Sequence, residues 1–384
     1  RFSCLRRSVW RPGAGGQAFA GSVLWYNYNI FFTKDGQSHM RTYRLALIGF
    51  GNVGQGLATL LRDQGAAIAG QHGAEFRIVA VNTARRGRIY DPDGFDPGQL
   101  LTAYDETHRV DSMPAAYQDW DVKRVIYESN ADIVVELTSS DLRTGQPATD
   151  YIRAAITQDR HVVTTNKGPI AFHYLELASL AAERGVMLGV EGTVMGGTPL
   201  LRVGRELLVN AGIERIQGIL NGTSNYILTR MAEGESYRSA LEEAQEKGYA
   251  EANPAADVEG FDAAVKIVIL SNLLLGIPLK LENVEREGIT GLKSKDIIRA
   301  QQVGEVWKLV AWVERTPDMV KATVRPIRLP QSHLLAGISG ATNAVTFVTR
   351  LLGDVTIVGP GAGRVETGYG VLSDLLDIHH RMNV

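Results

Sequence analysis

The stretch YRLALIGFGNVGQGLATLLRDQ at 43–64 constrains the fold more than any other part of the chain. It reads as a short apolar strand, a glycine turn and an amphipathic helix, which is the opening of a βαβ unit. Gly49, Gly51 and Gly54 match the pattern GxGxxG, in which glycines allow a tight turn and let backbone amides approach a pyrophosphate. The pattern alone is weak, but a second apolar strand, FRIVAVNT, follows at 76–83. The sequence therefore predicts a dinucleotide-binding unit.

Strands and helices continue to alternate after this opening. This alternation is typical of a parallel sheet, so we predict an α/β fold with a Rossmann-type nucleotide-binding domain. From residue 212 onward the pattern changes to a strand entering a helix, two further helices and late strands, which indicates a second, α+β domain. The predicted strands of the first domain lie at 131–140, 161–167 and 186–192, and its helices at 146–157 and 171–184.

Four segments are expected along the chain. They are a leader at 1–39, the nucleotide-binding domain at 40–185, the second domain at 186–350, and a C-terminal segment at 351–384 that returns to the nucleotide-binding domain. The leader is rich in Arg and has no acidic residue before Asp35, which is compatible with an organellar transit peptide. The alternative is an upstream extension of a reading frame that starts at Met40, and we expect the leader not to be part of the fold.

The charge balance and the cysteine count exclude several classes of protein. Forty Lys and Arg stand against 42 Asp and Glu, so nothing suggests the clustered positive charge that nucleic acids require. The only cysteine, Cys4, excludes an internal disulfide and a CxxC zinc site. The longest apolar run, at 267–277, contains Ser271 and Asn272 and is too short to span a bilayer. We therefore expect a cytoplasmic protein that binds neither nucleic acid nor membrane.

Charged side chains open a helix that is predicted to start near residue 258. Asp262 and Lys266 share one line of this helix with apolar residues, which places them at the edge of a buried face. An exposed i,i+4 ion pair stabilises a helix by only about 0.2 to 0.5 kcal/mol, so a pocket explains the placement better than the alternative of a surface ion pair. Asp257 is as well explained by capping the helix start as by contacting a ligand.

Polar residues follow two of the predicted strands. Lys167 stands at the carboxyl end of the strand predicted at 161–167, and Thr138, Ser139 and Ser140 end the strand at 131–140. Open parallel sheets bind ligands at the carboxyl ends of their strands, so these side chains are candidates for contacting a cofactor or substrate. The alternatives are a solvated loop charge for Lys167 and helix capping for the hydroxyl groups.

The order and spacing of several segments resemble the homoserine dehydrogenase family. These segments are GFGNVG, VVTTNKGPIA, EGTVMGGTPL, GILNGTSNYIL, GYAEANPAADVEGFDAAVK and GPGAG, and the resemblance covers roughly residues 43 to 384. It implies the reversible, NAD(P)-dependent interconversion of L-homoserine and L-aspartate 4-semialdehyde in the biosynthesis of threonine, methionine and isoleucine. It also implies a homodimer whose second domain binds substrate and forms the dimer.

The resemblance implies roles for single residues as well. Lys167 and Lys266 are the catalytic candidates, and Thr223, Glu251, Asp257 and Asp262 would hold the substrate. A structural sodium ion would be bound mostly by backbone carbonyls, with one carboxylate among neutral oxygens, a donor set that suits sodium better than a divalent ion. Its implied ligands are Glu191, Val194, Gly196 and Thr198, and the expected cofactor contacts are Gly49, Gly51, Asn52, Val53, Gly54, Thr138, Ser139, Lys167 and Gly361.

NADP is expected to be preferred over NAD. The position where NAD-specific proteins carry an acid for the ribose 2′-hydroxyl holds neutral residues here, and Arg85 and Arg86 follow within reach of a 2′-phosphate. The alternative is that both arginines are ordinary surface charges.

Two other functions are compatible with parts of the sequence. Aspartate-semialdehyde dehydrogenase uses the same metabolite but needs a cysteine nucleophile, and Cys4 in the leader cannot serve. A non-catalytic NADP-binding sensor would keep the fold, but it has no need for both lysines and the acids around them.

Overall fold

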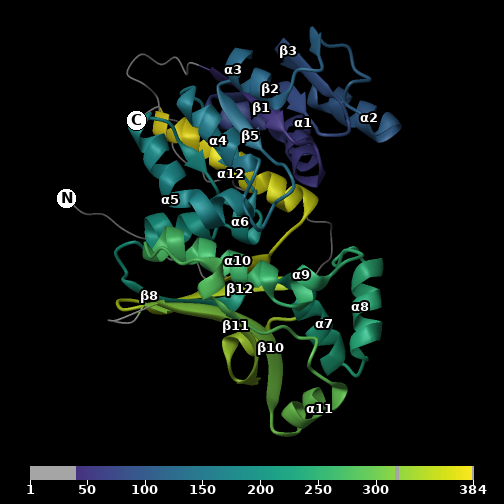
Figure 1. Ribbon diagram of the computed structural model, residues 1–384, viewed down its shortest axis with the longest axis vertical. Coiled ribbons are helices and arrows are strands. Elements are labelled where there is room, and N and C mark those ends of the chain that lie inside the picture. Colours follow the sequence, from purple (N-terminus) through teal and green to yellow (C-terminus); the bar gives the residue numbers. More distant parts are fainter. Residues whose placement is uncertain (1–39, 316–319, 383–384) are drawn as a thin grey trace, which may run out of the picture. The chain divides into compact units, whose positions relative to one another are not determined.

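The structure, a computed structural model, describes residues 40–315 and 320–382. The leader at 1–39 lies outside this range. The described chain forms a seven-stranded sheet, in the order β4-β3-β2-β1-β5-β6-β7, and a six-stranded sheet, in the order β13-β12-β8-β10-β11-β9 (Figure 1). The predicted fold class, a parallel nucleotide-binding sheet with a second α+β domain, is confirmed.

The first sheet has a parallel centre and an antiparallel edge. Strands β1, β2, β5, β6 and β7 run parallel, whereas β3 pairs antiparallel with β2 and with β4. The strand predicted at 186–192 is only two residues long, because the chain enters a short helix directly after it. The strands are β1 (Arg41–Ile48), β2 (Ala74–Asn82), β3 (Arg88–Phe95), β4 (Tyr117–Gln118), β5 (Ile133–Glu136), β6 (His161–Thr164) and β7 (Leu188–Gly189).

Helices cover both faces of this sheet, as the alternation along β1 requires. Leu45 and Leu47 pack with apolar residues of α1, α2 and α12, whereas Ala46 and Ile48 pack with those of α3, α4 and α5. Successive side chains of a strand point to opposite faces, so a strand buried on both faces is a continuous apolar run. The helices are α1 (Asn52–His72), α2 (Pro97–Thr107), α3 (Val122–Glu128), α4 (Ala148–Thr157), α5 (Lys167–Glu183), α6 (Gly192–Met195) and α12 (Arg364–Met382).

Helices pack against the second sheet and share one hydrophobic core with it. Its central strand β10 (Glu305–Arg315) was not predicted, and it pairs antiparallel with β8 (Ile213–Ile219) and β11 (Val320–Pro330). Buried residues of α10 (Phe261–Leu270) fill the core between these strands and α7 (Gly222–Ala232). The remaining elements are β9 (Glu285–Arg286), β12 (Thr342–Thr349), β13 (Gly353–Pro360), α8 (Tyr237–Glu246), α9 (Ala255–Val258), α11 (Ser294–Gln302), and the short helices η1 (Val203–Leu207), η2 (Ser271–Leu275), η3 (Leu281–Asn283) and η4 (Leu334–Gly337).

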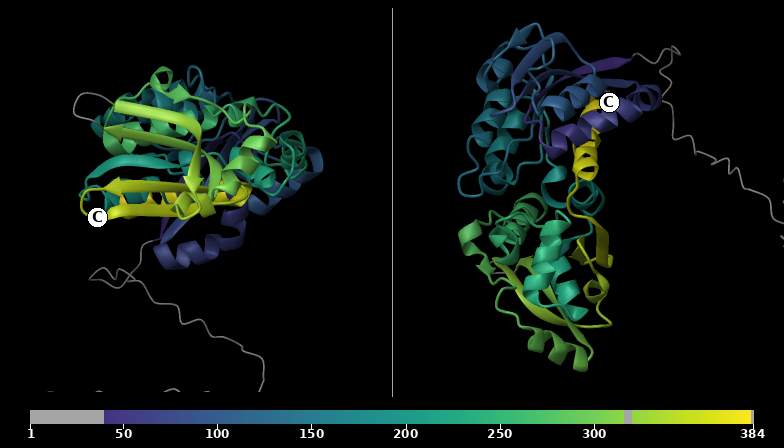
Figure 2. Two further views of the ribbon diagram at one scale, coloured as in Figure 1. Left: turned by 90° about the horizontal axis from the view of Figure 1, so that it is seen from below. Right: turned by 90° about the vertical axis from the view of Figure 1, so that its right-hand side faces the viewer.

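The chain returns to the first sheet at its end, later than predicted. We expected this return from residue 351, but β13 pairs with β12 along its whole length and so belongs to the second sheet. Only after Pro360 does a glycine-rich turn lead into α12, which lies alongside α1 (Figure 2). No helix in the described residues is long and apolar enough to cross a membrane.

Candidate active site

Two lysines from distant parts of the chain meet at one carboxylate. Lys167 Nζ lies 3.0 Å from Asp262 Oδ1, and Lys266 Nζ lies 2.9 Å from Asp262 Oδ2. Lys266 Nζ also donates to the carbonyl oxygen of Leu220, at 2.7 Å. Lys167 is the first residue of α5, just past the end of β6, while Asp262 and Lys266 lie one turn apart on α10. The sequence placed Asp262 and Lys266 at a pocket and Lys167 at a strand end, and the structure brings the three side chains together.

The two lysines differ in their surroundings. The side chain of Lys167 is 28% exposed and that of Lys266 only 8%. The charge of Asp262 raises the pKa of Lys167, whereas burial lowers the pKa of Lys266 in spite of the same carboxylate. Burial alone would raise the pKa of Asp262, but the two ammonium groups outweigh it and hold that pKa well below its usual value. Lys167 is therefore the more accessible and more firmly protonated of the two.

Asp257 does not cap the helix that carries this pair. That helix, α10, begins at Phe261 after Gly260, and Asp257 lies in the preceding short helix α9. Its Oδ1 accepts a hydrogen bond from Asn221 Nδ2 at 2.7 Å, and the same amide nitrogen lies 3.1 Å from Asp262 Oδ2. The capping alternative for the α10 start is thus wrong, because the chain turns between the two helices through the positive φ of Gly260, 76°.

Asn221 is a residue of this cluster that the sequence reasoning missed. Besides bridging the two carboxylates, it caps α7, because its Oδ1 accepts from Ser224 N at 2.8 Å. Asn just before Gly-Thr-Ser is a recognisable helix start, so a capping pattern in NGTSN was available as an indication. Leu220, whose carbonyl oxygen accepts from Lys266, gave no such indication because a main-chain acceptor is independent of the side chain.

The other predicted substrate residues lie on two neighbouring segments. Thr223 is buried in the first turn of α7 and donates through Oγ1 to the carbonyl oxygen of Tyr249, at 2.6 Å. Glu251 is exposed in the loop between α8 and α9. The charges of Asp257 and Glu251 both contribute to the raised pKa of Lys167, and Asp257 acts on Lys266 as well. Burial, together with the charge of Asp262, raises the pKa of Asp257.

The glycine turn has the form that a pyrophosphate needs. Gly49 has a φ of 111°, and a Cβ atom there would lie 2.5 Å from the carbonyl oxygen of Leu137. A Cβ on Gly54 would lie 3.0 Å from the carbonyl oxygen of Gly49, whereas one on Gly51 would meet nothing within 4 Å. Gly51 stands directly before α1, at the positive end of the helix dipole. Two glycines thus shape the turn and the third leaves open space before the helix, which fits a dinucleotide.

These positions predict opposite outcomes for two alanine substitutions. Gly51→Ala should leave the melting temperature nearly unchanged but weaken dinucleotide binding by roughly tenfold or more, because the new methyl group occupies the space for the pyrophosphate. Gly49→Ala should lower the melting temperature by several degrees, because it combines a strained φ with a backbone clash. Thermal unfolding and a cofactor titration on both variants check this pair. Tight binding by a folded Gly51→Ala protein would contradict the placement of the pyrophosphate.

The remaining predicted cofactor residues lie in different settings. Thr138 donates its hydroxyl to Glu136, and Ser139 beside it is exposed. Arg85 and Arg86 are exposed in the loop after β2, with the Arg86 guanidinium 5.2 Å from the centre of the Tyr104 ring. Asn52 and Val53 open α1, and Gly361 begins the turn that follows β13.

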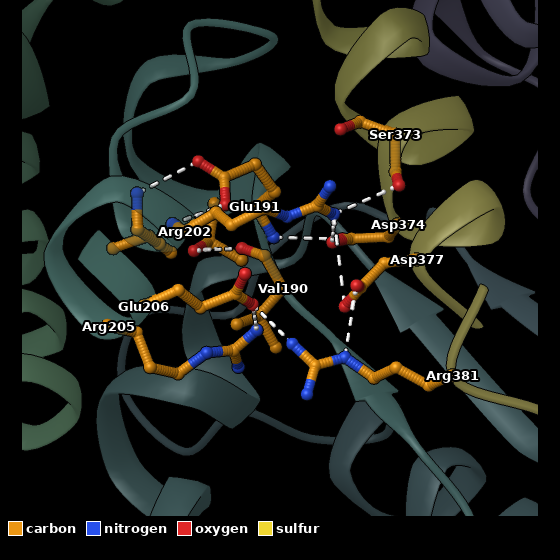
Figure 3. A network of polar contacts seen from close by, with 11 residues as sticks. Val190, Glu191, Arg202, Arg205, Glu206, Ser373, Asp374, Asp377 and Arg381 are labelled. Carbon is orange, nitrogen blue, oxygen red and sulfur yellow. Dashed lines mark hydrogen bonds and ion pairs between the residues drawn. The ribbon is translucent and has the colours of Figure 1, made fainter. Parts of the chain in front are cut away.

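The turn predicted to bind sodium is held by hydrogen bonds of its own. Both oxygens of the Glu191 carboxylate accept from main-chain amides, of Leu201 and Arg202, each at 2.8 Å (Figure 3). The amide of Glu191 in turn donates to the buried carboxylate of Asp374 on α12, at 2.9 Å. Each Glu191 oxygen thus holds one main-chain amide, which is compatible with the prediction that backbone carbonyls supply most ligands of the cation. In the described part of the chain, no group of three or more His, Cys, Asp or Glu side chains could hold a metal ion.

Comparison with known proteins identifies the family. Residues 199–376 match the family model described as homoserine dehydrogenase, and residues 49–191 match the model for the NAD-binding domain of homoserine dehydrogenase. An NAD(+)-dependent homoserine dehydrogenase of Pseudomonas canavaninivorans is 42% identical over 341 residues, which are 88% of this chain and 97% of the relative. The chain belongs to the homoserine dehydrogenase family.

Further relatives of the homoserine dehydrogenase family agree over the same length. A homoserine dehydrogenase of Methanocaldococcus jannaschii is 36% identical and is covered over 98% of its length, against 88% of this chain. The crystal structure of a putative homoserine dehydrogenase from Archaeoglobus fulgidus superposes with a TM-score of 0.79 at 37% identity, covering 88% of this chain and 99% of that one. A hyperthermophilic archaeal homoserine dehydrogenase mutant in complex with NADPH gives a TM-score of 0.76 at 29% identity, covering 89% and 98%.

Proposed function

We propose that this protein catalyses the reversible, NAD(P)-dependent interconversion of L-homoserine and L-aspartate 4-semialdehyde. The observation that carries the proposal is the placement of two lysines on the two oxygens of Asp262, at the carboxyl end of a parallel sheet that also carries the glycine turn. Reduction of an aldehyde needs a hydride for the carbonyl carbon and a proton for its oxygen. The nicotinamide would supply the hydride when bound, and side chains of this protein would supply the proton and hold the substrate.

Lys167 is proposed as the proton donor. Its ammonium group is partly exposed and is kept protonated by Asp262, so it can approach a carbonyl oxygen and stabilise the charge that develops there. In the oxidation of homoserine the neutral amine takes the hydroxyl proton back. Lys266 is more deeply buried and is tied to Leu220, which suits a group that holds the carboxylate and the substrate in position.

Carboxylates on the same side are proposed to hold the amino acid part of the substrate. Glu251 and Asp257 present negative charge near Lys167, and the substrate carries an ammonium group that such charges attract. Thr223 orders the loop that carries Glu251, since its hydroxyl donates to Tyr249 two residues earlier. Asp262 is proposed to act mainly through the two lysines.

Turnover of the purified protein tests this function. Oxidation of L-homoserine with NADP or NAD should produce reduced nicotinamide, which is followed by its absorbance, and L-aspartate 4-semialdehyde should be reduced in the opposite direction. A protein that binds the dinucleotide but turns over neither substrate would be the non-catalytic sensor, which nothing in the comparisons favours.

NADP is proposed as the preferred cofactor. Relatives do not decide the matter, since one is described as NAD(+)-dependent and a solved structure contains NADPH. In this chain, Arg85 and Arg86 follow β2 and are exposed, so both can reach a 2′-phosphate.

Replacing both Arg85 and Arg86 by Ala should therefore weaken NADP binding by roughly tenfold and leave NAD binding within about twofold, because only NADP carries the 2′-phosphate. Dissociation constants of both cofactors for the wild type and the double variant measure this change. An unaltered ratio of the two constants would contradict the assignment and leave the arginines as surface charges.

We further propose that the protein acts in the biosynthesis of threonine, methionine and isoleucine and forms a homodimer through its second domain, as the family resemblance implies. A structural sodium ion at the turn of Glu191, Val194, Gly196 and Thr198 is proposed on the same ground, held mostly by main-chain oxygens. Light scattering of the purified protein tests the dimer, and thermal unfolding in sodium against a bulky organic cation tests the ion.

A further inference from the structure

One buried carboxylate at the proposed cofactor edge is used neither for substrate binding nor for proton transfer. Glu136 is the last residue of β5 and is fully buried. In the sheet it pairs with Ile48, which directly precedes the glycine turn, and with Thr164, which ends β6 before Lys167. Glu136 therefore lies in the row of strand ends after which the predicted cofactor-binding loops begin.

Both oxygens of the Glu136 carboxylate accept hydrogen bonds from residues at neighbouring strand ends. Oε1 accepts from the amide of Thr138, at 2.9 Å, and from its hydroxyl, while Oε2 accepts from the hydroxyl of Thr164, at 2.9 Å. The donors continue outward, since Asn166 donates its amide to the Thr138 carbonyl, at 3.2 Å, and caps the helix of Lys167. The Glu136 carboxylate thus ties the end of β5 to the end of β6, which directly precedes the start of the helix of Lys167.

No positive side chain accompanies Glu136. Among the described residues, no Lys, Arg or His nitrogen lies within ion-pair distance of it, in contrast to Asp262 with its two lysines. Burial without a counter-ion raises the pKa of Glu136, whereas the donors of Thr138 and Thr164 on its two oxygens favour the ionised form. The proposed reaction itself brings a cation to this edge, because the nicotinamide ring is positively charged when oxidised and neutral when reduced.

We propose that the Glu136 carboxylate is a specificity-determining charge that makes the site bind the oxidised cofactor more tightly, relative to the reduced one, than an uncharged side chain would. The proposal rests on the proposed function, since it requires the nicotinamide to occupy this edge. In a protein interior with an effective dielectric constant of about 20, two opposite charges about 10 Å apart change a binding constant roughly tenfold. The interaction acts only on the oxidised form.

The substitution Glu136→Gln tests this directly. The amide can keep accepting from Thr138 and can donate to the Thr164 hydroxyl, so the hydrogen bonds persist while the charge is lost. Titration of the full chain with NADP⁺ and, separately, with NADPH, both without substrate, should show roughly tenfold weaker binding of NADP⁺ and a change within twofold for NADPH. A second neutral variant, Glu136→Ser, should shift the ratio of the two affinities in the same direction, and it decides the question if the glutamine variant does not fold.

Asp132→Asn is the matched control. Asp132 lies immediately before β5, at the other end of the same strand, and is paired with Arg44, so its replacement removes the same charge far from the cofactor. The ratio of NADP⁺ to NADPH affinity should not change in this variant. Equal losses for both cofactor forms in Glu136→Gln, or no loss for either, would overturn the proposal and leave Glu136 as a structural residue. Failure of the wild type to bind either dinucleotide would instead refute the proposed function.

Discussion

Lys167→Ala is expected to lower kcat for homoserine oxidation by a factor of about 10² to 10⁴, the range that a general acid–base group typically contributes. The reason is geometric, because Lys167 is the partly exposed lysine on Asp262, just past the end of β6 in the sheet that also carries the glycine turn. The affinity for NADP should persist, since the main-chain turn that receives the pyrophosphate does not involve this side chain. Steady-state kinetics and a cofactor titration on the same preparation separate the two quantities.

Lys266→Ala is the companion variant and should also lower kcat into this range. Lys266 is buried and donates to the carbonyl oxygen of Leu220, so Lys266→Ala should also lower the melting temperature. The melting temperature of Lys167→Ala should fall much less. Near-normal kcat in both variants would make the proposed chemistry untenable. A loss confined to NADP affinity in Lys167→Ala would show that this lysine is a cofactor ligand rather than a proton donor.

Asp262→Asn is expected to destabilise the protein by about 3 to 5 kcal/mol at neutral pH, the usual cost of removing one partner from a buried ion pair. The substitution leaves the ammonium group of Lys266 buried without its carboxylate and removes the partner that keeps Lys167 in place. Turnover should fall as well, for the same reason. Asp257→Asn is the control, because Asp257 accepts from Asn221 and should affect the KM for homoserine more than stability.

The difference in stability between the wild type and Asp262→Asn depends on pH with a definite sign. The pKa of Asp262 is lowered in the folded protein, so the unfolded chain binds its proton at a higher pH than the folded one does. The stability that this carboxylate contributes is therefore complete above its unfolded pKa of about 3.9 and is lost as the pH falls further. The difference between the melting temperatures of wild type and Asp262→Asn should be largest from neutral pH down to about pH 4 and should narrow as the pH falls further toward the lowered pKa of folded Asp262. A gap that widens on acidification would contradict this account.

Patterns of side chains allowed the first sheet to be predicted better than the second. Period and glycine placement mark β1, β2, β5 and β6 because a strand buried on both faces is an apolar run between turns. Strand β3 was not predicted because it contains Pro92 and Gly94, which are typical of a turn, and Gly94 has a positive φ. Strand β10 was not predicted because Lys308 interrupts its apolar run. In the structure Lys308 is buried and donates to Asn225.

The candidate site divides in the same way. Lys167, Asp262 and Lys266 were recognisable because charged side chains next to apolar runs are unusual and because their surroundings match a family. Leu220 was not recognisable, since a carbonyl acceptor leaves no trace in the sequence. Glu136 carried an indication that was not used, because an acid inside an otherwise apolar strand must be satisfied by neighbours that only the pairing of β5 with β6 reveals.

The return of the chain after β13 has a consequence for the order of synthesis. The apolar face of α1 is completed by α12, whose buried residues include Val371, Leu372 and Leu375. During translation the whole second sheet, through Pro360, leaves the ribosome before α12 does. The nucleotide-binding sheet, although it begins first, is therefore finished last, and its uncovered helix face needs protection from aggregation until the final segment emerges.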